Sequence, residues 1–246
     1  MDIELENNYT WWFDSTSIFL RYFILAGIGY FVFYVWRHKT FAFMKIQKDS
    51  PSAKIVRKEI GYSSLTLITF CATSWMIFQW EKSGITKIYR DIHQHSYAYF
   101  AVSIIIMIML HDAYFYWTHR LLHLPKLFNW IHKTHHLSSN PTPWASFSFH
   151  PVEAIISAGI IPLIVLSIPC HPYALFCFLT FMTFINVMGH LGYEAIPKWV
   201  TKGKIGKWQN TSTNHNIHHQ HSKCNFGLYF TFWDKLMGTH AVEKED

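Results

Sequence analysis

Long apolar runs separated by short polar connections dominate the chain. Residues 17–36 form an almost uninterrupted apolar run, of the length that a helix needs to cross roughly 30 Å of hydrocarbon. Residues 60–80 and 96–117 repeat this pattern, and residues 152–169 and 173–188 are typical of a helical hairpin. The pattern predicts an all-α fold: a multi-pass transmembrane helical bundle of about four to five spans.

The composition agrees with a membrane protein. Half of the 246 residues are hydrophobic, and charged residues make up 15%, well below the roughly 25% that is usual for soluble domains. Aromatic residues make up 18%, and Trp and Tyr gather near the ends of the apolar runs, as expected at headgroup level. We expect a single integral domain.

The distribution of charge predicts an orientation. The connection over residues 37–59 carries seven Lys or Arg residues against two acidic ones, and such an excess marks the cytoplasmic side. Residues 1–14 carry acidic residues without Lys or Arg, so we expect the N-terminus on the non-cytoplasmic side. The basic segment 198–207 then falls on the cytoplasmic side, as does the C-terminus. We expect a bacterial inner membrane or the endoplasmic reticulum as the location.

Histidines concentrate at the cytoplasmic ends of the predicted spans, and their spacing places several of them on one helix face. Positions three and four apart on a helix lie on the same face, and this offset recurs in three short segments. We therefore predict a histidine-rich helical cap on the cytoplasmic side of the bundle. The candidate metal ligands are His119, His123, His132, His135, His136, His215, His218 and His219.

His190 is a ninth candidate, because it lies at the end of the span that returns to the other histidines. The alternative for His190 is a hydrogen-bonded structural residue at the membrane interface. His111 points about 80° away from the face of His119 by the helical period, so it suits ligation less. Glu194 lies one turn after His190, and we expect it to support the ligands rather than bind metal.

Asp112 lies near the end of the third apolar run, where a carboxylate is costly unless it is paired. Two helical turns separate it from His119 on the same face. Asp112 could therefore orient a ligand histidine from outside the ligand set. The alternative is a helix-end residue in contact with water.

The ligand type narrows the choice of metal. Imidazole suits iron, zinc, copper and nickel, and the four scattered cysteines form no Cys-x-x-Cys pair. One metal cannot use so many histidines, so the pattern predicts two metals that share a nearly all-nitrogen site. A zinc protease would carry His-Glu-x-x-His, which the chain lacks. A histidine-rich surface that senses pH would need no repeated offsets.

At these residues the chain resembles the sterol desaturase and fatty acid hydroxylase superfamily of membrane-bound non-haem di-iron enzymes. The resemblance covers roughly residues 96–240 and includes Asp112, His190 and Glu194. It implies N-terminal spans and a basic loop over residues 1–95 and a catalytic region over residues 96–246. The motifs that carry it are His119-x-x-x-His123, His132-x-x-His135-His136 and His215-x-x-His218-His219.

The resemblance implies two iron ions that use O2 to attack a C–H bond of a lipid, of sterol, fatty-acyl or sphingoid type. Its motifs do not separate hydroxylation from desaturation, although the ending over residues 225–234 resembles sterol C5-desaturases most. Electrons would come from a separate donor, a cytochrome b5-like or ferredoxin-like protein with its reductase. The lysines of segments 45–58 and 198–207 could dock it, but they also serve topology and anionic headgroups. We expect no nucleic-acid partner.

The rival interpretation is a non-redox membrane metalloprotein, either a zinc-dependent lipid hydrolase or a metal transporter. A transporter would place its ionisable ligands near the middle of its spans. Here the candidate ligands lie at one end of the predicted bundle. The position of the histidines therefore favours the oxidase.

Overall fold

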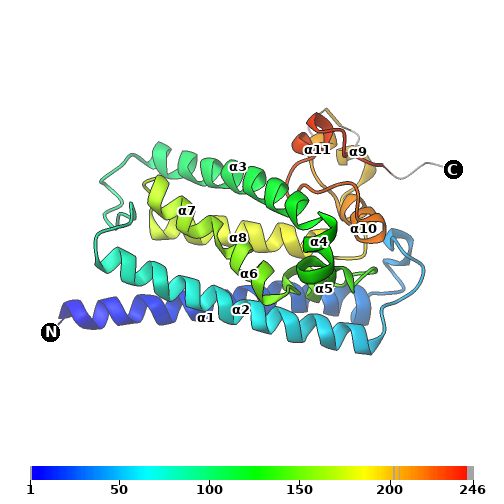
Figure 1. Cartoon of the computed structure of the whole chain (residues 1–246), viewed down its shortest axis with the longest axis horizontal. Helices are drawn as coiled ribbons and strands as arrows, with labels where there is room; N and C mark the ends of the chain where they lie inside the picture. Colours follow the sequence, from blue (N-terminus) through cyan, green and yellow to red (C-terminus); the bar gives the residue numbers. More distant parts are fainter. Residues whose placement is uncertain (1, 202, 205, 243–246) are drawn as a thin grey trace.

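The computed structural model describes residues 2–201, 203–204 and 206–242, with side chains from residue 11 onward. Within these residues the structure contains helices and no β-strand; three isolated bridges join loops. Four helices are long and apolar enough to cross a membrane, and all four extend along the long axis of the molecule (Figure 1). They are α1 (Asp2–Tyr30), α2 (Ala53–Lys82), α3 (Tyr97–Leu122) and α8 (Pro172–Gly189).

The first three spans are longer than the apolar runs alone predicted. Helix α1 begins at Asp2 and continues beyond Tyr30 as a π-helical segment, Phe31–Trp36. Helix α3 continues to Leu122, so His119 lies on its last turn. The candidate ligands at the end of the third run are therefore held by a rigid transmembrane helix.

Side-chain caps mark where three of the helices begin. The side chains of Ser52, Ser96 and Thr211 each accept a hydrogen bond from a backbone N–H in the first turn of α2, α3 and α10 (Ser212–His221), respectively. Such caps satisfy N–H groups that have no partner within the helix. Helix α10 therefore begins three residues before His215.

The predicted hairpin is present, but its first arm is broken. Helices α6 (Pro151–Ala158) and α7 (Ile160–Ser167) meet at Gly159 before the chain turns into α8. The Tyr114 hydroxyl donates to the Ile156 carbonyl at 2.6 Å. A Cβ atom at Gly159 would lie 2.7 Å from that hydroxyl, so glycine leaves room for the tyrosine. Tyr114 thus interrupts the arm from outside.

The short helices gather at one end of the bundle, on the right in Figure 1. This confirms a helical cap that carries the histidines, on an all-α multi-pass membrane bundle. The elements of the cap are α4 (Pro125–Leu127), the π-helical segment Phe128–His132, α5 (Lys133–His136), α9 (Lys198–Thr201), α10 and α11 (Phe232–Leu236).

The segment Pro143–Phe147, a 3₁₀ helix, lies between α1, α2 and α8 and supports the cap from within. The hydroxyls of Tyr22 on α1 and Ser63 on α2 both donate to the carbonyl of Trp144, at 2.7 and 2.8 Å. The buried carboxylate of Glu59 accepts a hydrogen bond from the Thr142 hydroxyl. These bonds satisfy polar groups inside the bundle and fix the wall beside the histidines.

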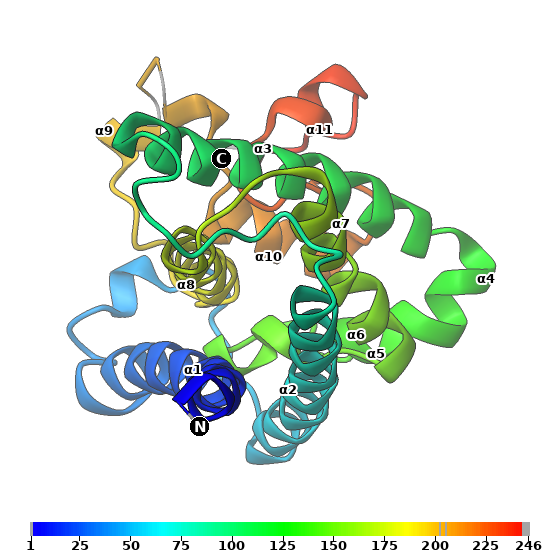
Figure 2. The same cartoon turned by 90° about the vertical axis from the view of Figure 1, so that its left-hand side faces the viewer.

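Figure 2 shows the bundle from its other end, with α1 and α2 below, α3 above, and α7 and α8 between them. Large apolar side chains remain exposed on the outward faces of the long helices, which suits contact with lipid. They include Ile24, Ile28, Ile68, Ile105 and Met109.

Candidate metal centre

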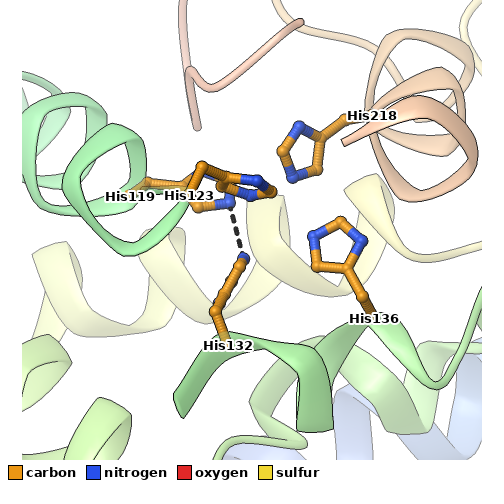
Figure 3. Close-up of side chains that lie close together, drawn as sticks. All are labelled: His119, His123, His132, His136 and His218. Atoms are coloured by element: carbon orange, nitrogen blue, oxygen red, sulfur yellow. Dashed lines mark hydrogen bonds between the residues drawn. The ribbon is translucent and has the colours of Figure 1, made fainter. Parts of the chain in front are cut away.

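Five imidazole rings from three segments meet at the cap end of α3 (Figure 3). His119 and His123 come from the end of α3, His132 and His136 from the short helices that follow it, and His218 from α10. One ring nitrogen of each lies within 4.8 Å of the others. We call this group the five-histidine cluster.

A second group, the four-histidine cluster, contains His135, His190, His215 and His219, all buried. The Nε2 atom of His190 lies 3.2 Å from that of His135, 3.0 Å from that of His215 and 3.3 Å from that of His219. The Nε2 atoms of His215 and His219 are 3.2 Å apart. Four ring nitrogens therefore converge on one point.

These separations are those of ligands around a metal ion. Nitrogens bound at about 2.1 Å from a metal lie about 3.0 to 3.4 Å from their neighbours in octahedral or tetrahedral geometry. His190 donates through Nδ1 to the Asn186 carbonyl at 2.8 Å, so its Nε2 carries the lone pair of a neutral ring. A cation at the centre would satisfy this Nε2 and the three that surround it.

In the five-histidine cluster, hydrogen bonds to backbone carbonyls hold two of the ring nitrogens that face away from the centre. The Nδ1 atoms of His119 and His218 donate to the carbonyls of Phe226 and Cys224, at 2.8 and 2.7 Å. Because a carbonyl only accepts, each Nδ1 must carry the proton and each Nε2 lone pair is free for a ligand bond. The backbone of residues 224–230, which we call the closing loop, therefore fixes the tautomer of two rings.

Glu153 anchors a third ring of the five-histidine cluster. Its Oε1 atom accepts from Nδ1 of His132 at 2.7 Å, and both side chains are almost wholly buried. The Nε2 of His132 then lies 3.1 Å from the Nε2 of His119. A carboxylate behind a histidine is a common way to orient a metal ligand and to raise its basicity.

Several buried ring nitrogens lack a partner among the described residues. They include the Nε2 atoms of His123, His136 and His218, which belong to the five-histidine cluster. A buried acceptor without a partner costs about 1 to 3 kcal/mol, so a cluster of them is costly unless something binds there. A metal ion would satisfy all three, and the donor set fits iron, zinc or copper.

The rings outside the spans are neutral at pH 7. Burial lowers the pKa of His136 to about 3 and that of His190 to about 4, and neighbouring imidazoles add to the effect. Burial and the adjacent rings also hold the pKa of His135, His215 and His219 well below its usual value. Neutral imidazole is the form that binds metals.

An apolar cavity of about 790 Å³ runs through the bundle and ends at Phe115 and Phe149, whose rings lie beside those of His119 and His135. Its far end is lined by Asp14, Arg21, Glu81 and Arg90. A smaller pocket, which touches rings of both clusters, shares five lining residues with the cavity. The shared residues are His111, Phe115, Phe149, Ser157 and Asn186. The cavity thus adjoins the pocket that rings of both clusters line, and its volume lies in the ordinary range for ligand sites.

Comparison with known proteins places this centre in a family. The sequence profile described as fatty acid hydroxylase matches residues 104–239, more than half of the chain. The chain belongs to the fatty acid hydroxylase family. The resemblance that the histidine motifs indicated is thereby confirmed, and the matched segment contains both clusters.

The relatives of this family member include enzymes named for sterols. A Delta(7)-sterol 5(6)-desaturase of Gibberella zeae is 28% identical over 76% of this chain and 56% of that protein. Lathosterol oxidase of Homo sapiens is 27% identical over 92% and 72%, and a Delta(7)-sterol 5(6)-desaturase of Candida albicans is 31% identical over 91% and 55%. The chain thus spans about half to three quarters of these relatives. No solved structure matches it.

All nine histidines that the sequence singled out as ligands lie in the two clusters. Neighbours in sequence separate here: His135 joins the four-histidine cluster and His136 the five-histidine cluster. His111 lies outside both, and its Nδ1 atom is 2.8 Å from the Tyr229 hydroxyl. Whether each ring binds metal stays a prediction.

Asp112 is linked to the ring of His119 indirectly. Its Oδ1 atom accepts from the backbone N–H groups of Tyr229 and Phe230, at 3.1 and 3.2 Å, instead of contacting the ring of His119. Asp112 holds the closing loop, and that loop orients His119 through the Phe226 carbonyl.

Glu194 supports a helix rather than a ring. Its Oε2 atom accepts from the N–H and the hydroxyl of Thr213, at 3.0 and 2.6 Å, in the first turn of α10. A carboxylate is favourable at a helix N-terminus, where N–H groups point outward. Because α10 carries His215, His218 and His219, Glu194 positions rings of both clusters.

Sequence reasoning missed the part of Glu153. A carboxylate two residues after Pro151, at the start of an apolar helix, is a signal that could have found it. The carbonyls of Phe226, Cys224 and Asn186 left no such signal, because every residue type supplies a backbone carbonyl.

Proposed function

We propose that this chain is an O2-dependent lipid oxidoreductase that binds two iron ions, one in each histidine cluster. The observation that supports it most is the convergence of two sets of neutral, buried imidazoles at the inner end of an apolar cavity. The relatives named sterol desaturase and lathosterol oxidase support the same conclusion. The proposed substrate is a sterol, and the proposed reaction is desaturation.

The choice of iron over zinc rests on family membership and on the second cluster. All-imidazole sites suit both metals, but a zinc hydrolase needs one catalytic ion with an activated water. A pair of adjacent histidine sites is more than hydrolysis requires. A transporter is also disfavoured, because both clusters lie at the cap end of the bundle, beyond the middle of the spans.

The reaction balances with an external donor. Desaturation takes two hydrogens from adjacent carbons, and with O2, two electrons and two protons it yields a double bond and two waters. Hydroxylation with the same O2, electrons and protons yields one alcohol and one water. Bound iron would supply the activation of O2 for attack on an unactivated C–H bond.

The residues of the chain contribute position and exclusion of water. Glu153 and the closing loop hold three Nε2 atoms toward the interior of their cluster before metal binds. Phe115 and Phe149 line the inner end of the cavity, so a substrate carbon there would lie in an apolar space beside the rings. Such a space keeps a reactive oxidant away from bulk water.

The cavity suits an extended lipid. Helix α8 lines it from Pro172 to Asn186, which is about 21 Å along the helix at about 1.5 Å per residue. A lipid within the bundle could reach the histidines without passing through water. This geometry supports a membrane-dissolved substrate over a soluble one.

The proposed orientation puts the cap in the cytoplasm, with the N-terminus across the membrane, in a bacterial inner membrane or the endoplasmic reticulum. The excess of Lys and Arg over residues 37–59 supports it. A cytochrome b5-like or ferredoxin-like donor, with its reductase, would then approach the cap. The basic residues of segments 45–58 and 198–207 suit an acidic electron carrier.

The test is turnover by purified protein in lipid nanodiscs, loaded with Fe(II) under anaerobic conditions. With a Delta(7)-sterol, an electron donor and O2, we expect a product two mass units lighter by mass spectrometry. Omission of O2 should abolish it. Zinc-loaded protein that acts without O2, or release of a hydrolysis product, would contradict the proposal.

A further inference from the structure

The inner end of the cavity holds few polar groups, and not all of them have an assigned part in the metal centre. Three polar side chains occur among the residues that the cavity shares with the smaller pocket: His111, Ser157 and Asn186. Asn186 donates its side-chain amide N–H to the Ser146 carbonyl at 2.8 Å, and its backbone carbonyl accepts from Nδ1 of His190. Asn186 therefore supports the wall and the four-histidine cluster.

His111 is held rigidly at this place. It is 6% exposed, and its ring packs edge-on against Phe115, Phe178 and Tyr229. Its Nδ1 atom is 2.8 Å from the Tyr229 hydroxyl, and the backbone N–H of Tyr229 is bonded in turn to Asp112. The ring therefore has one orientation, fixed by the closing loop.

The second nitrogen of His111 is free to meet a ligand. Nε2 has no hydrogen-bond partner among the described residues, and His111 lines the cavity. A polar atom in an apolar cavity loses free energy unless a partner reaches it. The partner that fits is a hydroxyl group, which can donate to Nε2 or accept from it.

A sterol that reacts at carbon 5 would place its 3-hydroxyl at the inner end of the cavity, because the two groups are close together in the molecule. The hydroxyl at carbon 3 is separated from carbon 5 by three single bonds of about 1.5 Å, so the two lie at most about 4.5 Å apart. An enzyme that attacks carbon 5 must therefore hold the hydroxyl close to its metals. On the proposed function, the polar end of the substrate belongs at the inner end of the cavity.

We propose that His111 hydrogen-bonds the 3-hydroxyl of a sterol through Nε2 and thereby positions the ring carbons beside the two clusters. The inference rests on the proposed function and adds to it the residue that recognises the substrate and the direction in which the substrate lies. The Tyr229 hydroxyl, held by the closing loop, sets the orientation of His111.

A lipid bound in the opposite direction, with its polar group at the far end of the cavity, would contact different residues. The far end of the cavity carries Arg21 on α1, whose guanidinium bonds no acceptor among the described residues, and the Arg90–Glu81 ion pair. A lipid with its headgroup there would present a carbon far down its chain to the histidines. Substitution of Arg21, rather than of His111, would then govern recognition of the polar group.

The experiment compares a Delta(7)-sterol with its 3-deoxy analogue in wild-type protein, His111→Phe and Arg21→Gln. In wild type we expect kcat/KM to favour the hydroxylated sterol by about 5- to 150-fold, the range for one buried hydrogen bond. His111→Phe should bring that ratio close to one, because both substrates then lack the bond. Arg21→Gln should leave the ratio unchanged.

Controls separate recognition from folding. Binding of radiolabelled sterol and of its 3-deoxy analogue to the metal-free protein should show the same loss of preference in His111→Phe, and iron content should stay at the wild-type value. Tyr229→Phe keeps the aromatic ring of residue 229 but removes the hydroxyl that anchors His111. This variant should lower the ratio only in part. Ser157→Ala, at a neighbouring hydroxyl, should not lower it.

The outcomes are distinct. An unchanged ratio in His111→Phe overturns the inference while sterol turnover by wild type leaves the proposed function in place. A ratio that falls in Arg21→Gln or in Ser157→Ala, but not in His111→Phe, assigns recognition elsewhere and also overturns it. Wild-type protein that neither binds nor turns over any sterol contradicts the proposed function and this inference together.

Discussion

The two histidine clusters differ in how their rings are held. In the five-histidine cluster, the outer nitrogens of His119, His132 and His218 bond to oxygen atoms of the closing loop and of Glu153. In the four-histidine cluster, His190 bonds to a carbonyl of its own helix. The Nδ1 atoms of His135 and His219 in that cluster are buried without a partner in the described residues.

This difference indicates how much each site depends on its metal. Rings whose tautomer and orientation are fixed from outside are preorganised, and they lose less entropy when metal binds. The four-histidine cluster depends more on the helices that bring its rings together. We therefore expect the five-histidine cluster to bind its metal more tightly and to tolerate the loss of a ring better.

The largest effect should come from His190→Ala. His190 Nε2 approaches all three other rings of its cluster, so its removal leaves three ligands without their central neighbour. We expect the loss of one bound iron and a fall in turnover of more than about 100-fold, beyond the effect of an outer partner. Metal analysis and product formation would measure both.

The matched variant is His123→Ala, which leaves four nitrogens in the five-histidine cluster. It should retain both irons and lose less turnover than His190→Ala. The reverse ranking would break the comparison between the clusters.

The second prediction concerns pH, because rings of both clusters outside the spans have a lowered pKa in the folded protein. The pKa is about 3 for His136 and about 4 for His190, against about 6.5 in an unfolded chain. As pH falls below about 6.5, the unfolded state takes up protons first. The stability of the metal-free protein should therefore be full above pH 6.5 and decline toward pH 4.

Denaturant unfolding in nanodiscs at several pH values would follow this decline. His190→Phe, which removes one such group, should flatten it. A stability that stays constant or rises between pH 7.5 and 5 would show that the rings are not buried in neutral form.

The third prediction concerns Glu153→Gln. This variant removes the carboxylate that accepts from His132, and no other candidate ligand in the described residues bonds to it. Loss of an outer partner typically costs about 10- to 100-fold in metal affinity. We expect the loss to fall on one iron, with the four-histidine cluster unaffected. Glu81→Gln, at the far end of the bundle, serves as the control. Equal loss of both irons would argue against separate sites.

The smallest effect should follow Asp112→Ala. The variant frees the N–H groups of Tyr229 and Phe230, while Asp234 still bonds the N–H groups of Phe226 and Gly227. We expect about a 10-fold loss of metal affinity, at the lower end for an outer partner and confined to the five-histidine cluster. Titration with Fe(II) would measure it. No change would limit Asp112 to a structural part.

Much of this fold follows from the sequence, because length and apolarity alone determine whether a helix can cross a membrane. The gathering of histidines was predictable as well, since His119 and His123 lie four apart on one face. The division of the histidines into two clusters was not predictable. His135 and His136 point about 100° apart on a helix, but which cluster each joins depends on where α10 lies.

The outer partners were the hardest part to predict. Spacing places Asp112 and His119 on one face of α3, but it gives no sign of the closing loop that links them. Glu153 meets His132 only through tertiary packing of α6. Contacts between elements distant in sequence leave no periodic pattern, so a single sequence carries little trace of them.

The most direct test of the account is the iron content of the purified chain after anaerobic loading with Fe(II) and removal of excess metal. Elemental analysis should find close to two irons per chain in wild type, and one in His190→Ala. One iron or none per chain in correctly folded wild-type protein, or zinc retained at both sites with turnover that needs no O2, would contradict two iron-binding histidine clusters.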